Sequence, residues 1–151
     1  MTARMAVPLK PRLFRRILIP TDLSDRTAGA LDIASRMPSA RGTRLTLLHV
    51  IQTIPDVSVH ELRRFYRQLE TRAFRRMSRF AARVGDGGHG ITQEVVYGSP
   101  AREIVRFATA HKVDLIVLPS HPVDLSLVHR GWGTVSYKVG IMSRCPVLLV
   151  K

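Results

Sequence analysis

Short apolar runs alternate with segments of helical hydrophobic spacing from residue 16 to the end of the chain. Runs of four to eight apolar residues that end at a proline or a polar cluster are typical of strands buried on both faces. The pattern predicts five such strands, at residues 16–20, 43–51, 91–97, 114–119 and 146–150.

Four helices are predicted between these strands, because apolar residues recur there every three or four positions. The first runs from about 26 to 37, with its inward side formed by Ala30, Leu31, Ile33 and Ala34. The longest runs from about 59 to 84 after an N-cap at Ser58. Its apolar stripe consists of Val59, Leu62, Tyr66, Leu69, Ala73, Met77, Phe80 and Val84. The third covers 101–111, and the fourth begins at the N-cap Thr134.

Strictly alternating strands and helices predict an α/β fold with a doubly wound parallel sheet, because parallel neighbours need crossover helices. Such sheets bind ligands at the carboxyl ends of the strands where the winding reverses. With the fourth strand placed beside the first, the loops at 21–25 and 120–132 flank that crevice. In the first loop, Asp22 is placed to accept hydrogen bonds from a ribose or a base.

Charge is the unusual feature of the composition. The chain has 151 residues, with 24 Lys and Arg against 11 Asp and Glu, for a net charge of +13. We expect a mobile basic arm at 1–14 and one domain at 15–151. Five arginines gather on one flank of the longest helix: Arg72, Arg75, Arg76, Arg79 and Arg83. They form either a solvated face or a surface for weak, non-specific binding of polyanions, including nucleic acid.

The single cysteine precludes an internal disulfide, and no apolar run approaches the length of a membrane span. We therefore expect a cytoplasmic protein that makes no membrane contact. His121, Asp124 and His129 match no known metal-ligand spacing, and no Gly-x-Ser-x-Gly elbow surrounds Ser120. Neither a metal site nor hydrolase chemistry is expected.

At these residues the chain resembles the universal stress protein family. The matching segments follow that family's order and spacing: RILIPTDLS, TLLHVI, GSPAREIVRFA, DLIVLPSH and GTVSYKV with CPVLLVK. The resemblance implies a Rossmann-like fold of the adenine-nucleotide alpha-hydrolase type, with strand order 3-2-1-4-5. It also implies a stress-response role and homodimers, for which the final strand offers Val147, Leu148, Leu149 and Val150.

In nucleotide-binding members, ATP is held by the ends of the first strands and by a glycine motif. Carried over by resemblance, the candidate site comprises Pro20, Thr21, Asp22, Val50, Leu118, His121, Gly133, Thr134, Val135 and Ser136. Pro119 and Pro122 stand where that family has its two leading glycines. Proline has a fixed φ and no N–H, so it offers no donor to a phosphate.

Two functions stay open. The first is a non-enzymatic regulatory homodimer with a degraded nucleotide pocket, acting through an unknown protein partner. The second is an ATP-binding switch, with slow hydrolysis at most, in which Arg130 or Lys138 replaces the lost amides. ATP or another adenine nucleotide is the one cofactor that the sequence suggests.

Overall fold

The computed structural model describes residues 14–37, 39–85, 90–122 and 134–151. Of the residues predicted as a basic arm, 1–14, residues 1–13 lie outside these ranges, as does most of the loop at 120–132. Phe14 does not belong to an arm, because it begins the first strand. The strands are β1 (Phe14–Thr21), β2 (Ser39–Gln52), β3 (Gly90–Gly98), β4 (Leu115–Pro119) and β5 (Val147–Val150). The helices are α1 (Arg26–Arg36), α2 (Arg63–Val84), α3 (Pro100–Ala110) and α5 (Val135–Met142).

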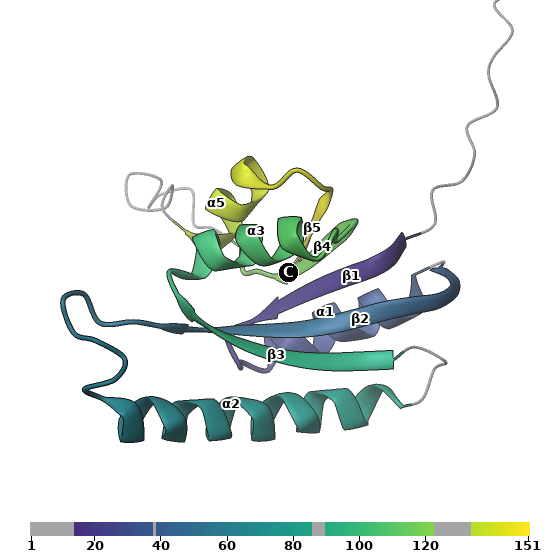
Figure 1. Ribbon diagram of the computed structural model, residues 1–151. Helices are drawn as coiled ribbons and strands as arrows, with labels where there is room; N and C mark the ends of the chain where they lie inside the picture. Colours follow the sequence, from purple (N-terminus) through teal and green to yellow (C-terminus); the bar gives the residue numbers. More distant parts are fainter. Residues whose placement is uncertain (1–13, 38, 86–89, 123–133) are drawn as a thin grey trace, which may run out of the picture.

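The five strands form one parallel sheet in the order β3-β2-β1-β4-β5, which confirms the predicted topology. Helices α1 and α2 cover one face, and α3 and α5 cover the other (Figure 1). The winding reverses between β1 and β4, since β2 and β3 extend the sheet to one side of β1 and β5 extends it to the other. A doubly wound sheet of this kind opens its ligand crevice at that reversal.

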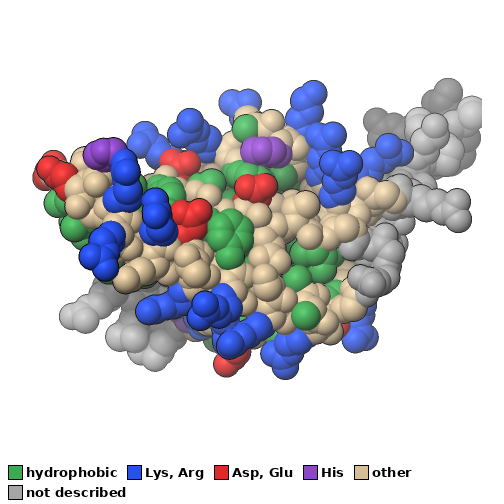
Figure 2. Space-filling view, turned by 60° about the horizontal axis from the view of Figure 1, so that its bottom comes forward, with side chains coloured by type: hydrophobic (Ala, Val, Ile, Leu, Met, Phe, Trp, Pro, Cys, Tyr) green, Lys and Arg blue, Asp and Glu red, His purple; other side chains and the backbone are tan. Residues whose placement is uncertain are grey.

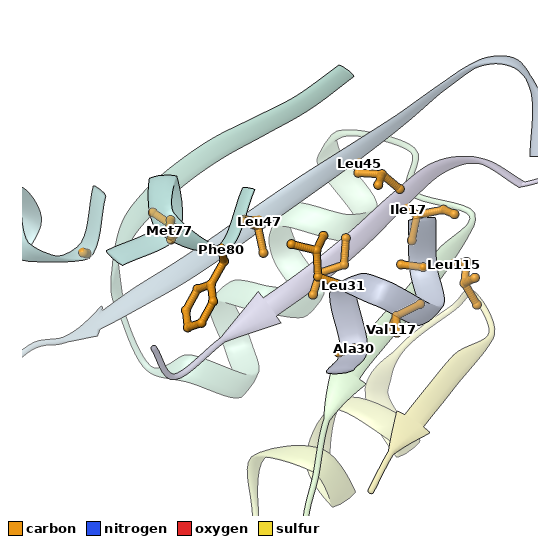
Figure 3. Packing of buried hydrophobic residues seen from close by; sticks show 12 residues of the cluster. Ile17, Ala30, Leu31, Leu45, Leu47, Met77, Phe80, Leu115 and Val117 are labelled. Atoms are coloured by element: carbon orange, nitrogen blue, oxygen red, sulfur yellow. The ribbon is translucent and has the colours of Figure 1, made fainter. Parts of the chain in front are cut away.

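Two hydrophobic clusters hold the layers together, because successive side chains of a strand point to opposite faces. Ile17 of β1 packs in one cluster with Leu31 of α1 and Met77 of α2 on one face (Figure 3). Ile19 of β1 belongs to the same cluster. Leu18, between them, packs on the other face with residues of α3 and with Val139 of α5. The apolar runs of β1 and β4, Ile17–Ile19 and Leu115–Leu118, are thus buried on both faces, as their sequences predict.

Helix α2 begins at Arg63, four residues later than the sequence predicts. Ser58 does make the expected capping bonds, since its Oγ accepts from the Glu61 N–H and its N–H donates to the Glu61 carboxylate. These bonds close a separate turn before α2 begins, and the Val59 side chain in that turn remains 39% exposed. The prediction that Val59 belongs to the buried stripe is wrong. Tyr66, Ala73, Met77 and Phe80 form its buried part.

A second correction concerns α1. Ile33 was placed on its inward side, but the side chain is 40% exposed, and Thr27 is buried in its stead. Thr27 faces inward because its hydroxyl hydrogen-bonds the Thr21 hydroxyl at the end of β1, with 2.7 Å between the two oxygens. A buried threonine with a satisfied hydroxyl cannot be told from a surface threonine by hydrophobic spacing.

Candidate ligand site

A cavity of about 330 Å³ lies at the carboxyl ends of β1, β2 and β4, beside the first residues of α3 and α5. Its wall is formed by Pro20, Thr21, Asp22, Arg26, Leu48, His49, Val50, Pro100, Ile104, Leu118, Pro119, His121, Thr134, Val135 and Ser136. The cavity therefore sits at the predicted switch point.

The position of the cavity follows from the pairing of β1. On one side β1 stays in register with β2 as far as Thr21, which lies opposite His49. On the other side its register with β4 pairs Ile17 with Leu115 and Leu18 with Ile116. Beyond those pairs the ends of both strands, Pro20 and Thr21 on β1 and Leu118 and Pro119 on β4, line the cavity.

The loop after β1 is held by its own polar groups. The Asp22 carboxylate accepts from the Ser24 backbone N–H at 2.9 Å and from the Arg26 guanidinium at 3.3 Å. The Thr21 hydroxyl accepts from the N–H of Leu23, whose φ of 67° forms the bend. Partial burial acts to raise the pKa of Asp22, but hydrogen bonding by Ser24 and by Arg26 outweighs it and lowers that pKa below 3.8. Asp22 is therefore an ionised acceptor at neutral pH.

His49 is an unexpected member of the site. The sequence indicates a hydrogen-bonded core histidine, and its Nδ1 does lie 2.8 Å from the Thr21 carbonyl oxygen. The ring is half-buried, however, and it lines the cavity. Because a carbonyl oxygen can only accept, Nδ1 is the donor, and in the neutral ring Nε2 remains as an acceptor.

The amino end of α5 closes the cavity on another side. Thr134 caps the helix as predicted, with its Oγ1 accepting from the Tyr137 N–H at 3.3 Å. The first backbone N–H groups of a helix have no intrahelical acceptor, and they carry partial positive charge. Thr134, Val135 and Ser136 all line the cavity, so this end of α5 can receive an anionic group.

Pro119 removes a donor from the cavity. Ile116 and Ser120 donate their N–H groups to carbonyls at Pro146 and Val150, beside and within β5. Since N–H groups alternate sides along a strand, position 119 faces β1 and the crevice between β1 and β4. A proline there supplies no N–H. Pro122, in contrast, is exposed and does not line the cavity.

Most of the predicted site residues meet at this cavity: Pro20, Thr21, Asp22, Val50, Leu118, His121, Thr134, Val135 and Ser136. Gly133 and Arg130 lie outside the described residues, and Lys138 is exposed without lining the cavity. Sequence reasoning missed Arg26, Leu48, His49, Pro100 and Ile104. Only Arg26 carried a signal, because it follows Asp22 by four residues, the spacing of a helical ion pair.

Within residues 14–37, 39–85, 90–122 and 134–151, no three His, Cys, Asp or Glu side chains gather in a way that could hold a metal ion. Asp124 and His129 are not among these residues. No helix in the same ranges has the length and apolar character needed to cross a membrane.

The sheet order and the cavity at its switch point define an α/β protein of the adenine-nucleotide alpha-hydrolase type. The model of the universal stress protein family matches residues 13–151, and the chain belongs to that family.

The comparisons with known proteins agree. The universal stress protein YxiE of Bacillus subtilis is 30% identical over 154 residues, which cover 92% of this chain and all of that protein. The structure of MJ0577 of Methanocaldococcus jannaschii is similar with a TM-score of 0.77 and 30% identity, covering 93% and 97% of the two chains. A universal stress protein in complex with cAMP shares the fold, with a TM-score of 0.70, 20% identity, and 93% and 99% coverage.

Proposed function

We propose that this chain is a non-enzymatic, cytoplasmic regulatory protein whose cavity binds the adenosine part of an adenine nucleotide, with little added by a triphosphate. One observation carries the proposal. The polar groups suited to a nucleoside, Asp22 and His49, line the same cavity as Pro119, which lacks an N–H for a phosphate.

The adenosine part has suitable surroundings. The ionised Asp22 carboxylate accepts from ribose hydroxyls or from an exocyclic amine, and Leu48, Val50, Ile104 and Leu118 provide apolar wall for a base. A phosphate is received by the amino end of α5. Relatives of the same fold were solved in complex with cAMP and with dAMP, and each of those ligands carries a single phosphate.

The test is calorimetry with adenosine, AMP and ATP, with and without Mg²⁺. Pro119 cannot donate a hydrogen bond to a phosphate, and the loss of such a bond to a charged group costs about 1.5–3 kcal/mol. The triphosphate should therefore add little affinity, and we expect ATP to bind within about threefold of AMP. In Pro119→Gly, ATP affinity should rise by roughly tenfold or more, while adenosine affinity stays unchanged.

Pro122→Gly is the matched control, because Pro122 does not line the cavity. It should leave all three affinities within about twofold of wild type. Failure of adenosine, AMP and ATP alike to bind would refute the proposal. A strong ATP preference in the wild-type chain would refute the role given to Pro119.

The alternative is an ATP-binding switch with slow hydrolysis, and one observation favours it. Arg26 lines the cavity and is half-exposed, so its guanidinium can turn from Asp22 toward a phosphate. This alternative predicts tight, Mg²⁺-dependent ATP binding that Arg26→Gln weakens by roughly tenfold or more. By either route, we propose that regulation acts through a protein partner.

We further propose that the protein is a homodimer formed through β5. This strand is an edge of the sheet, and Leu149 exposes 40% of its surface there. An apolar edge strand with free backbone groups is suited to pairing with its own copy about a twofold axis.

A further inference from the structure

From helix α2 we propose a second binding surface, one that takes single-stranded nucleic acid without sequence selectivity. This surface consists of Phe65, Arg72, Arg75, Arg79 and Arg83 on the flank of α2 that faces α1. It is separate from the cavity at the carboxyl ends of the strands.

Arginine dominates α2 to an unusual degree. The helix contains eight arginines, one glutamate and no lysine. Glu70 is already engaged, since its carboxylate accepts from the Tyr97 hydroxyl at 2.6 Å. Figure 2, with the α2 side turned toward the viewer, shows Lys and Arg side chains clearly exceeding Asp and Glu on this face.

The arginines of the surface lie in one row. Arg72, Arg75, Arg79 and Arg83 follow one another at three- and four-residue steps, which place them on one side of a helix. Arg76, beside them, shows where that side points, because its guanidinium binds the Asp25 carboxylate at 2.6 Å just before α1 begins.

The row has no partner among the described residues. Within the part that the structure describes, Arg72, Arg75, Arg79 and Arg83 make no ion pair and no side-chain hydrogen bond, and all four are exposed. Like charges at this spacing repel one another, so the row does not stabilise α2. An external anion with regularly spaced charges removes that repulsion. Arginine suits phosphate in particular, because its planar fork donates two parallel hydrogen bonds to phosphate oxygens.

Two features favour a single strand over a duplex. Phe65 is 47% exposed and lies two helical turns before Arg72 on the same side, where an unpaired base can stack on it. At the opposite end, Arg83 lines a hollow of about 460 Å³ that has room for an unpaired base; its wall also includes Val84, Ile91 and the ion pair of Arg36 with Asp32. From Phe65 to Arg83 the helix extends about 27 Å, enough for several nucleotides.

The test is fluorescence anisotropy with a labelled oligo(dT) of roughly 16 nucleotides, over a range of salt concentrations. The triple variant Arg75→Gln, Arg79→Gln, Arg83→Gln should bind about tenfold or more weakly at low salt. Its slope of log affinity against log salt should be shallower by about 2, since each neutralised single-strand phosphate contributes about 0.7. Phe65→Ala should weaken binding by roughly fivefold or more.

The matched control removes the same charge from the opposite layer, as Arg102→Gln, Arg106→Gln, Arg144→Gln. These three arginines are exposed on or beside α3 and α5. The proposal expects less than about a twofold change in the control. An equal loss in both triple variants would overturn the proposal, because affinity would then follow net charge alone. Tighter binding to a duplex of the same length, to poly-glutamate or to anionic vesicles would also overturn it. A thermal melt of each variant checks that the variant is folded before its binding is compared.

Discussion

Asp22 and Arg26 form an ion pair that lines the cavity, and this pair determines which charged and polar groups of a ligand can bind there. Burial acts to raise the pKa of the carboxylate, but hydrogen bonds from Ser24 and Arg26 lower it, and the side chain is still more than half exposed. Its Oδ2 is shared with Arg26, so a ligand hydroxyl or amine can join that bond or replace it. The sequence identified Asp22 from its place after the first strand. It did not identify His49, because only the register of β1 and β2 brings that ring to the Thr21 carbonyl.

Asp22→Asn tests the carboxylate. The substitution keeps the acceptor for Ser24 but places an N–H or a neutral oxygen where the charged Oδ2 was. We expect adenosine affinity to fall by about tenfold, since a hydrogen bond to a charged group contributes about 1.5–3 kcal/mol. The measurement is titration calorimetry, and Asp32→Asn is the control, since Asp32 forms the same kind of exposed ion pair, with Arg36, but does not line the cavity. An unchanged adenosine affinity in Asp22→Asn would exclude the carboxylate from the site.

At the scale of elements, α2 is anchored to β3 by aromatic and polar contacts. Tyr66 and Tyr97 meet edge to face with ring centroids 5.7 Å apart, and the Tyr97 hydroxyl binds Glu70. Burial, and then the hydrogen bond and negative charge of Glu70, raise the pKa of Tyr97 to about 12. The apolar stripe of α2 was predicted correctly through its middle, since periodicity identifies the buried side. The start of α2 was predicted wrongly, because a capping pattern at Ser58 does not show whether the residues that follow continue into the helix.

The raised pKa of Tyr97 predicts a pH dependence of stability. Its ordinary value is 10.0, so between about pH 10 and 12 the unfolded chain loses this proton while the folded chain keeps it. The contribution of Tyr97 to the free energy of unfolding is therefore complete below pH 10 and is lost as the pH rises toward 12. Tyr97→Phe should show a smaller loss of stability over that range.

Urea unfolding at about pH 9 and pH 11 measures this difference. Glu70→Gln should lie between wild type and Tyr97→Phe, because it removes the negative charge but leaves the burial. Identical pH profiles for wild type and Tyr97→Phe would show that Tyr97 ionises equally in both states.

At the scale of the whole molecule, the edge strand β5 is the place where we propose that two copies of the chain pair. Leu148 and Val150 pack against the cluster under α1, whereas Leu149 points to the other face and is exposed. A substitution at Leu148 would therefore damage the core as well as any interface. A substitution at Leu149 would change the proposed interface without removing a side chain from the core.

Leu149→Lys should convert a wild-type dimer into a monomer in sedimentation velocity, with little change in the melting temperature of the fold. A charge on an edge strand opposes pairing with another strand. The control is Phe74→Lys, which adds the same charge at an exposed apolar position on α2, away from β5. A wild-type protein that already sediments as a monomer would contradict the proposed dimer.

The sequence by itself determined the alternation of strands and helices and the parallel sheet. Periodicity and crossover handedness leave few other arrangements. The position of the switch point followed once the fourth strand was placed beside the first, as in the strand order that the family resemblance implies. The tertiary structure alone decided which polar residues share the cavity. Arg26, His49 and Pro100 come from three separate segments, and no local pattern relates them. It also distinguished Pro119 from Pro122, because the direction of an N–H depends on strand pairing. A local sequence pattern reports on one segment at a time, whereas this cavity depends on how separate segments pack against one another.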